Sequence, residues 1–425
     1  MLNGRREGAG GDVLAWAICG ALFLATVLNY MDRQTLSMAA PLIQRELALN
    51  NAQIGILFSA FFYTYGLMQA VTGWILDRVS VRWGYAVSVF FWSAAGALTG
   101  LIGNFGQLFG CRLLLGVGEA ANWPAALRTV ARVMPPDKRS LANGIFNSGA
   151  SAGAVITPPL VVYLSMKSGW RTAFVAIGAL GILWVILWLA MTSKAPALAR
   201  ESREAARRNI NESGTADLLS TWPQILSSSR FWGLLLASIC GNPCYYFYST
   251  WLATYFVQKR AMHFNTQLGT VMLVAYVALG LGSALGGLPV FWLTRRGWTI
   301  YRSRKAALMF ISAMTLPAMI VPYTRTFSVV LAIIIIVTAG MGAWIANYIS
   351  AMQDLSPRNV ASVAGTVGCF GAFAGALGMW LVGVVSSTSY GFAPVFIALG
   401  LLPVIGSLGI IVPRSPALKQ LEASR

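Results

Sequence analysis

Long apolar stretches, each close to 20 residues, alternate with short polar ones along most of the chain. A helix of about 20 apolar residues is long enough to cross the hydrocarbon core of a bilayer. The first stretch is too long for a secretory signal and lacks its small-residue cleavage site, so we expect it to remain as a spanning helix. The pattern predicts twelve spans, at residues 14–40, 53–76, 84–103, 107–130, 140–165, 172–192, 231–257, 267–293, 306–323, 328–353, 360–385 and 392–412.

A polar, charge-mixed segment at residues 193–230 separates the first six predicted spans from the last six. Basic clusters recur in the second inner loop of each set, at Arg78 with Arg82 and at Arg295 with Arg296. Repeated halves are typical of transporters, whose substrate site lies near the bilayer midplane at the interface of the repeats.

The predicted fold is therefore an all-α membrane protein with twelve transmembrane helices in two pseudo-symmetric six-helix halves. The N-terminal half takes residues 1–192, a cytoplasmic linker takes residues 193–230, and the C-terminal half takes residues 231–425. The composition agrees, because 57% of the residues are hydrophobic and only 10% are charged. A soluble domain carries far more charge.

The net charge of +18 could indicate a nucleic-acid partner, but the placement of the basic residues favours another interpretation. Of the 31 Lys and Arg residues, 23 fall in segments on the side of the N-terminus and six fall in the opposite loops. Basic residues are enriched in the cytoplasmic loops of membrane proteins. We therefore expect both termini and the linker in the cytoplasm, and no nucleic-acid partner.

The five cysteines all lie in apolar runs, and the single histidine, His263, lies in a polar loop. Cysteines in such runs are most often small core residues. No nucleophile–base pair or set of metal ligands is visible in the sequence. We expect no catalytic residue, no metal and no cofactor, and hence no enzyme.

Four charged residues fall well inside predicted spans, and they occupy only two helices; Arg128, at the inner end of the fourth span, is counted with the cytoplasmic loops. Asp32 and Arg33 lie in the first span, and Arg112 and Glu119 lie in the fourth. Charges in the bilayer are costly, so such residues usually face a bundle interior or a water-filled cavity and serve function. Arg112 and Glu119 are two helical turns apart and share a face, whereas Asp32 and Arg33 point about 100° apart. We expect the two helices to form one charged site.

The two acids and the two arginines of this site cancel in charge. Arginine stays protonated, and its planar fork suits a carboxylate. A buried acid beside arginines can gain and lose a proton near neutral pH. An organic anion entering the neutral site would leave it negative, and one proton would restore neutrality. We expect Asp32 and Glu119 to couple protons, and Arg33 and Arg112 to bind the anion. The alternative is that all four form structural ion pairs between the helices.

Other polar residues within the spans are candidates for substrate contact. The tyrosines among these candidates could instead be interfacial anchors, and the glycines around Asn147 could serve close helix packing instead of gating. The candidates are Tyr65, Gln69, Asn147, Asn242, Tyr245, Tyr246, Trp344 and Asn347. The second inner loop of the N-terminal half predicts a cytoplasmic gate, against the alternative of plain solvated charge; the gate consists of Asp77, Arg78 and Arg82.

Several stretches give the chain a resemblance to a known family over nearly its whole length. They are Gly73–Arg78, Gly118–Ala126, Gly144–Gly149, Arg295–Trp298, Ala343–Asn347 and Val360–Val363. With them the chain resembles the major facilitator superfamily, its anion:cation symporter family, and within that the bacterial hexuronate transporters. The resemblance implies proton-coupled uptake of sugar acids. It assigns Asp32 and Glu119 to proton coupling, and Arg33, Arg112 and Tyr65 to the substrate carboxylate and its surroundings.

The function expected from both arguments is proton-coupled symport of an organic anion into the cell. The anion would be a hexuronate such as glucuronate or galacturonate, and the protein a monomer in the bacterial inner membrane. Similar transporters often have Asp-Pro where this chain has Asn242-Pro243, which leaves the exact sugar acid open. The alternatives are an exchanger or exporter of organic anions, and a membrane sensor that binds an anion without moving it.

Overall fold

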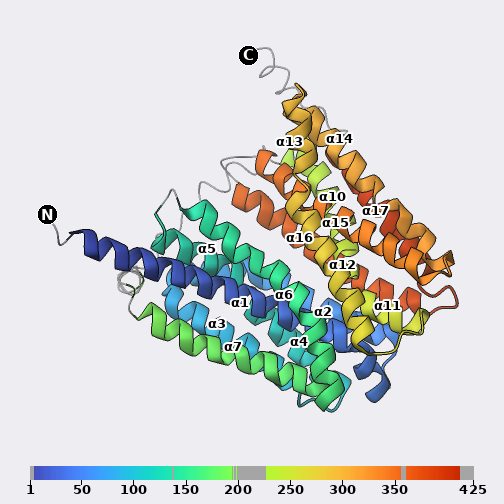
Figure 1. Cartoon of the computed structure of the whole chain (residues 1–425), viewed down its shortest axis with the longest axis horizontal. Helices are drawn as coiled ribbons and strands as arrows, with labels where there is room; N and C mark the ends of the chain where they lie inside the picture. Colours follow the sequence, from blue (N-terminus) through green and yellow to red (C-terminus); the bar gives the residue numbers. More distant parts are fainter. Residues whose placement is uncertain are drawn as a thin grey trace. The chain divides into compact units, whose positions relative to one another are not determined.

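The computed structural model describes residues 4–135, 138–193, 195, 198, 226–355 and 360–411. These residues form α-helices and one 3-10 helix, with no strand among them (Figure 1). The all-α prediction is confirmed. The chain forms two compact units, one of Met1–Glu212 with Ala253–Leu273 and one of Ser213–Leu252 with Val274–Arg425.

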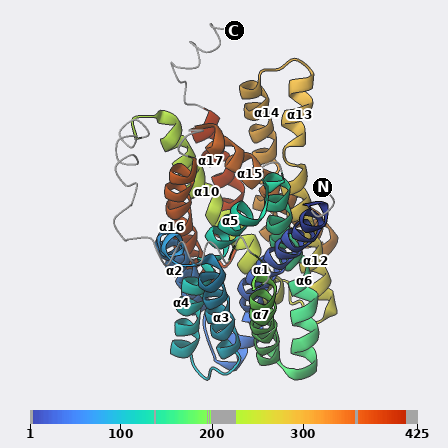
Figure 2. The same ribbon diagram turned by 90° about the vertical axis from the view of Figure 1, so that its left-hand side faces the viewer.

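The first unit contains the N-terminal helices and a short segment from later in the chain. Its helices are α1 (Gly4–Glu46), α2 (Asn51–Arg78), α3 (Val81–Thr99), α4 (Phe105–Glu119), α5 (Asn122–Val133), α6 (Arg139–Ser168), α7 (Trp170–Thr192), nearly all of α11 (Leu252–Lys259) and the first turns of α12 (Thr266–Leu285). Within it, α1 packs along α6 and α7, and α3 packs along α7 (Figure 2).

The second unit takes the rest of α12 and the helices around α10. They are α10 (Ser229–Thr250), α13 (Leu288–Arg295), α14 (Ile300–Ala313), the 3-10 helix η1 (Leu316–Tyr323), α15 (Phe327–Leu355), α16 (Val360–Ser386) and α17 (Ala393–Ile411). Here α10 packs against both α16 and α17. Most of the predicted linker, residues 193–230, lies outside the described residues.

The described helices form twelve passes of the chain, because four of the passes are made of two consecutive helices: α4 with α5, α10 with α11, α12 with α13, and α14 with η1. Eight helical stretches in the described residues are long and apolar enough to cross a membrane. They are Val13–Glu46, Ala142–Ser168, Trp170–Thr192, Thr266–Arg295, Arg302–Tyr323, Phe327–Ala351, Thr366–Ser386 and Ala393–Ile411.

The break between α4 and α5 lies inside a span that the sequence pattern reads as continuous. Pro124 has no N–H group, so it cannot donate to the carbonyl of Ala120 four residues earlier. The hydroxyl of Thr72 in α2 donates to that carbonyl instead, at 3.2 Å. A second bond, from the Tyr85 hydroxyl to Oδ1 of Asn122 at 2.6 Å, holds the first residue of α5. The break falls directly after Glu119 and places that acid at a helix end.

Glycines set how closely the helices around the charged residues approach one another. A Cβ on Gly149 would lie 2.5 Å from the Phe23 carbonyl oxygen, and one on Gly153 would lie 2.5 Å from the Val27 carbonyl oxygen. The backbone of α6 therefore rests on the backbone of α1, and these two glycines serve packing in this structure. Gly116 plays the same part between α4 and α2, where a Cβ would lie 2.5 Å from the Phe61 carbonyl oxygen.

Candidate functional site

An ion pair between α1 and α4 forms the centre of the candidate site. Nε of Arg33 donates to Oε2 of Glu119 at 2.5 Å. The Glu119 side chain is fully buried, whereas the Arg33 side chain is 17% exposed. A buried pair is favourable only if its remaining polar atoms are also satisfied. Nη2 of Arg33 and Oε1 of Glu119 have no hydrogen-bond partner in the described structure, so both side chains keep unused bonding capacity.

Arg112 lies two turns before Glu119 on α4 and is buried to 97%, with 3% of its surface exposed. No carboxylate of the described residues lies at ion-pair distance from it, and its Nε has no hydrogen-bond partner there. The charges of Glu119, Asp32 and Arg33 act on it. A guanidinium of this kind is a permanent positive charge that can accept a carboxylate without displacing an existing ion pair.

Asp32 is also buried, and it points towards α3. Its Oδ1 lies 2.7 Å from the place where a Cβ on Gly96 would be, so a larger residue there would require the carboxylate to shift. Its Oδ2 has no hydrogen-bond partner among the described residues. The charges of Glu119, Arg112 and Arg33 all act on it. An unpaired carboxylate in a dry site is costly, and a proton removes that cost.

Aromatic rings surround the arginines. Cζ of Arg33 lies 5.2 Å from the ring centroid of Tyr30, 4.9 Å from that of Phe61 and 4.4 Å from that of Tyr65. Cζ of Arg112 lies 5.0 Å from the same Phe61 ring. The close approach of α2 to α4 at Gly116 brings the rings of Phe61 and Tyr65 to the charges, whereas Tyr30 lies on α1 with Arg33. Phe61 is absent from the residues predicted from sequence, although it lies one turn before Tyr65 on the same helix face.

Comparisons with known proteins decide the family. The sequence profile of the Major Facilitator Superfamily matches residues 22–379 of the chain. The chain belongs to this superfamily.

Several relatives of the chain are named as transporters of sugar acids. The "Hexuronate transporter" of Escherichia coli (strain K12) is 30% identical, over 96% of this chain and 96% of the relative. The "Galacturonate transporter" of Dickeya chrysanthemi is 31% identical, over 73% of this chain and 93% of the relative. The "Probable galactarate/D-glucarate transporter GudP" of Bacillus subtilis (strain 168) is 30% identical, over 93% and 91%.

Solved structures agree on the fold. A bacterial homologue of the human lysosomal transporter Spinster, in an inward-facing and unoccupied conformation, matches with a TM-score of 0.74 at 19% identity, over 94% of this chain and 95% of that one. The nucleoside transporter NupG matches with a TM-score of 0.72 at 14% identity, over 93% and 98%. The protein is thus a multi-pass membrane transporter with the twelve-helix fold of its superfamily, and not an enzyme.

The structure brings Asp32, Arg33, Arg112, Glu119 and Tyr65 of this transporter into one cluster within the first unit. In the first unit, Gln69 is half-buried on α2 and Asn147 is exposed on α6.

Five predicted contact residues lie in the second unit. Tyr245 and Tyr246 are half-buried on α10, with ring centroids 5.8 Å apart. The Asn242 amide donates to the Ser238 carbonyl at 2.9 Å and to its hydroxyl at 3.0 Å.

The remaining two lie on α15 and bond within the second unit. The buried indole N–H of Trp344 donates to the Ser407 hydroxyl at 2.9 Å. The Asn347 amide donates to the carbonyls of Gly286 at 2.7 Å and Ala343 at 2.9 Å. Both side chains thus have structural hydrogen bonds in this conformation.

Of the predicted gate residues, only the Arg82 side chain is described, and those of Asp77 and Arg78 lie outside the described part. Nη2 of Arg82 donates to the Leu189 carbonyl at 3.2 Å, and the Trp188 indole donates to the Arg82 carbonyl at 2.9 Å. These contacts join the start of α3 to the end of α7.

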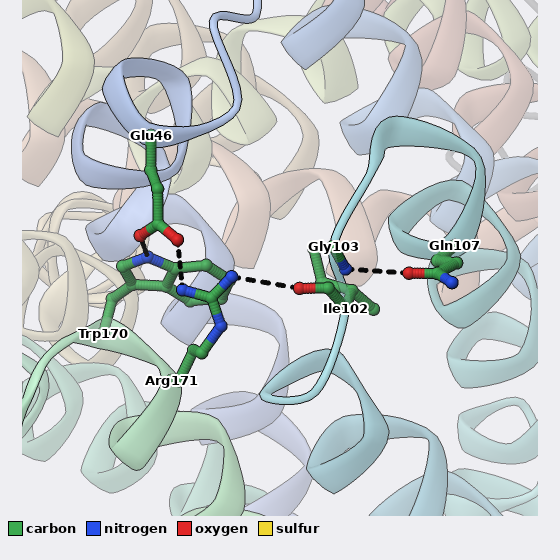
Figure 3. Close-up of polar contacts among 6 residues, drawn as sticks. All are labelled: Glu46, Ile102, Gly103, Gln107, Trp170 and Arg171. Atoms are coloured by element: carbon green, nitrogen blue, oxygen red, sulfur yellow. Dashed lines mark hydrogen bonds and ion pairs between the residues drawn. The ribbon is translucent and has the colours of Figure 1, made fainter.

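Two polar clusters that were not predicted from the sequence lie at the other ends of these helices, away from Arg82. Glu46, at the end of α1, accepts from the Trp170 indole at 2.6 Å and pairs with Arg171, whose Nη2 donates to the Ile102 carbonyl at 3.0 Å (Figure 3). In the second cluster the amides of Gln44, Asn51 and Gln258 hydrogen-bond to one another. The sequence pattern ends the first span at residue 40, but α1 continues to Glu46.

Proposed function

We propose that this transporter carries a sugar acid, a hexuronate such as glucuronate or galacturonate, into the cell together with a proton. One observation carries the proposal: in a single buried cluster, one arginine is held by a glutamate and the other forms no ion pair with the described residues. The names of the relatives at about 30% identity support the class of substrate.

The coupling follows from competition for Arg33. While Glu119 is ionised, it holds the Arg33 guanidinium, so an incoming carboxylate must compete with it. A proton on Glu119 removes the negative charge and frees Arg33 to form a charge-assisted bond with the anion. Arg112 forms no ion pair with the described residues and is available throughout. Proton and anion therefore bind best together, and each raises the affinity for the other by the same factor.

Asp32 provides a second place for a proton. It has no counter-ion at ion-pair distance among the described residues, and Glu119 adds a like charge nearby. Two ionised carboxylates in one dry site repel each other. Asp32 can take up or release a proton without breaking an ion pair. Its protonation then keeps the total charge of the site near zero as the anion enters and leaves.

The orientation in the membrane is proposed from the distribution of basic residues. Because 23 of 31 Lys and Arg residues fall on the side of the N-terminus, both termini and the linker at residues 193–230 are placed on the cytoplasmic side of a bacterial inner membrane. Asp77, Arg78 and Arg82 then belong to the inner gate. The transporter acts as a monomer whose halves, residues 1–192 and 231–425, alternate around the site.

Uptake of labelled glucuronate and galacturonate into proteoliposomes tests the proposal. An imposed gradient that is acidic outside should drive accumulation above equilibrium, and a protonophore should abolish it. If accumulation does not depend on the pH gradient and requires sugar acid inside the proteoliposomes, the transporter is an exchanger and the symport proposal is wrong.

A further inference from the structure

Two buried guanidinium groups share one aromatic ring in the charged cluster. The Cζ atoms of Arg33 and Arg112 lie 4.9 Å and 5.0 Å from the ring centroid of Phe61. Phe61 is 1% exposed, and its ring stacks on that of Tyr65 with centroids 5.5 Å apart and planes inclined by 22°. Of the three rings that contact Arg33, only the Phe61 ring also has a described contact with Arg112.

Arg112 has no counter-ion at contact distance among the described residues, although the charges of Glu119 and Asp32 act on it. Arg33 and Arg112 carry like charges and repel each other, and among the described residues Glu119 forms an ion pair with Arg33 alone. The Nε of Arg112 has no hydrogen-bond partner in the described structure. The negative face of an aromatic ring attracts a guanidinium within about 6 Å of its centroid, and the attraction strengthens away from water. Phe61 meets these conditions for both arginines.

We propose that Phe61 is a positioning residue, whose ring holds the Arg33 and Arg112 guanidiniums where both can reach one anion. The inference rests on the proposed function, because it concerns the same anion site. An aliphatic side chain of similar volume would fill the space between α2 and α4, but it would have no negative face to hold the cations. Phe61 then sets anion affinity through the two arginines, without a polar group of its own.

The backbone of Phe61 is fixed independently of its ring. A Cβ on Gly116 would lie 2.5 Å from the Phe61 carbonyl oxygen and 3.0 Å from the Tyr65 amide nitrogen, so α2 and α4 touch at this level through their main chains. Changing the electronic character of the ring alone should therefore leave the helix packing in place. That separation makes the electrostatic part of the proposal measurable.

The test replaces Phe61 by fluorinated phenylalanines through nonsense suppression, because successive fluorines weaken the negative face and keep the ring's shape. Affinity for glucuronate and galacturonate is measured by calorimetry on the purified full-length transporter, and its Tm reports folding. We expect affinity to fall stepwise with fluorination, by about tenfold for the trifluorinated ring. Phe61→Leu should bind at least as weakly as the trifluorinated form.

Phe174→Leu is the matched control, because Phe174 is equally buried in α7 and contacts Trp170 instead of the arginine pair. It should lower the Tm and leave the affinity unchanged. Equal affinity across the fluorinated series, with the wild type binding sugar acid, overturns the role of Phe61 and leaves the proposed function intact. A wild type that binds no sugar acid at all would overturn both.

Discussion

Arg33 and Glu119 form the ion pair that joins α1 to α4, although Arg112 lies on the same helix face as that glutamate, two turns away. The two arginines are therefore unequal. One is held by an acid that can be protonated, and the other forms no ion pair with the described residues. This inequality makes proton binding and anion binding depend on each other.

The first prediction concerns pH. Protonation of Glu119 frees Arg33, so the affinity for the anion should rise as pH falls and decline as pH rises. One linked proton gives a change of about tenfold per pH unit within the titrating range. In Glu119→Gln the guanidinium is free at every pH, and this dependence should flatten. Calorimetric titrations of both proteins across a series of pH values measure it. Parallel curves for the two proteins would exclude Glu119 as the linked acid.

The second prediction concerns Asp32→Asn. The amide is isosteric with the carboxyl group, so the helix packing against Gly96 should remain. Because a proton can no longer bind there, accumulation driven by a pH gradient should be abolished, while exchange of labelled for unlabelled substrate continues. Both assays use the same proteoliposomes, so exchange reports that the variant is folded. Accumulation to the wild-type level would show that Asp32 has no part in coupling.

The third prediction concerns Arg112→Lys. Lysine keeps the positive charge but loses the planar fork that binds a carboxylate through two parallel hydrogen bonds. We expect anion affinity to fall by at least about tenfold. The Tm should change little, because Arg112 forms no ion pair with the described residues that the substitution could break. Calorimetry and thermal unfolding on the same sample separate the two effects. Wild-type affinity in the variant would mean that the guanidinium fork does not bind the anion.

The fourth prediction concerns the space that Gly96 leaves for Asp32. In Gly96→Ala the new methyl group would lie 2.7 Å from Oδ1 of Asp32, so the carboxylate or α3 must move. Overpacking of this kind costs about 1–3 kcal/mol, so the Tm should fall by several degrees and gradient-driven uptake should weaken. Gly20→Ala on α1 is the control, since nothing lies within 4 Å of its new Cβ, and it should be neutral or slightly stabilising. Equal Tm values for the two variants would contradict the packing described for Asp32.

Much of this fold follows from sequence because the bilayer constrains it strongly. A spanning helix needs about 20 apolar residues, so the length of each run predicts a pass. The four charges inside those runs are few enough to be found by counting. Pro124 is a sequence signal for the break after Glu119, but the apolar pattern alone predicts a continuous span.

The pairing inside the site could not be predicted in the same way. Asp32 and Arg33 are adjacent, and only the rotation of α1 against α3 and α4 decides which of them meets Glu119. The contacts that fix α1 join residues far apart in the chain: its backbone at Phe23 and Val27 rests on Gly149 and Gly153 of α6, and the Asp32 side chain lies against Gly96 of α3. Phe61 and the cluster of Glu46 with Trp170 and Arg171 were missed for the same reason, because their roles arise from neighbours on other helices.

The central claim is that an anion enters this site together with a proton. The direct measurement follows internal pH and labelled glucuronate or galacturonate at once in proteoliposomes that begin with equal pH on both sides. We predict that adding the sugar acid outside acidifies the interior in step with uptake, and that Glu119→Gln abolishes the acidification. Uptake by the wild-type transporter with no change in internal pH would contradict the account.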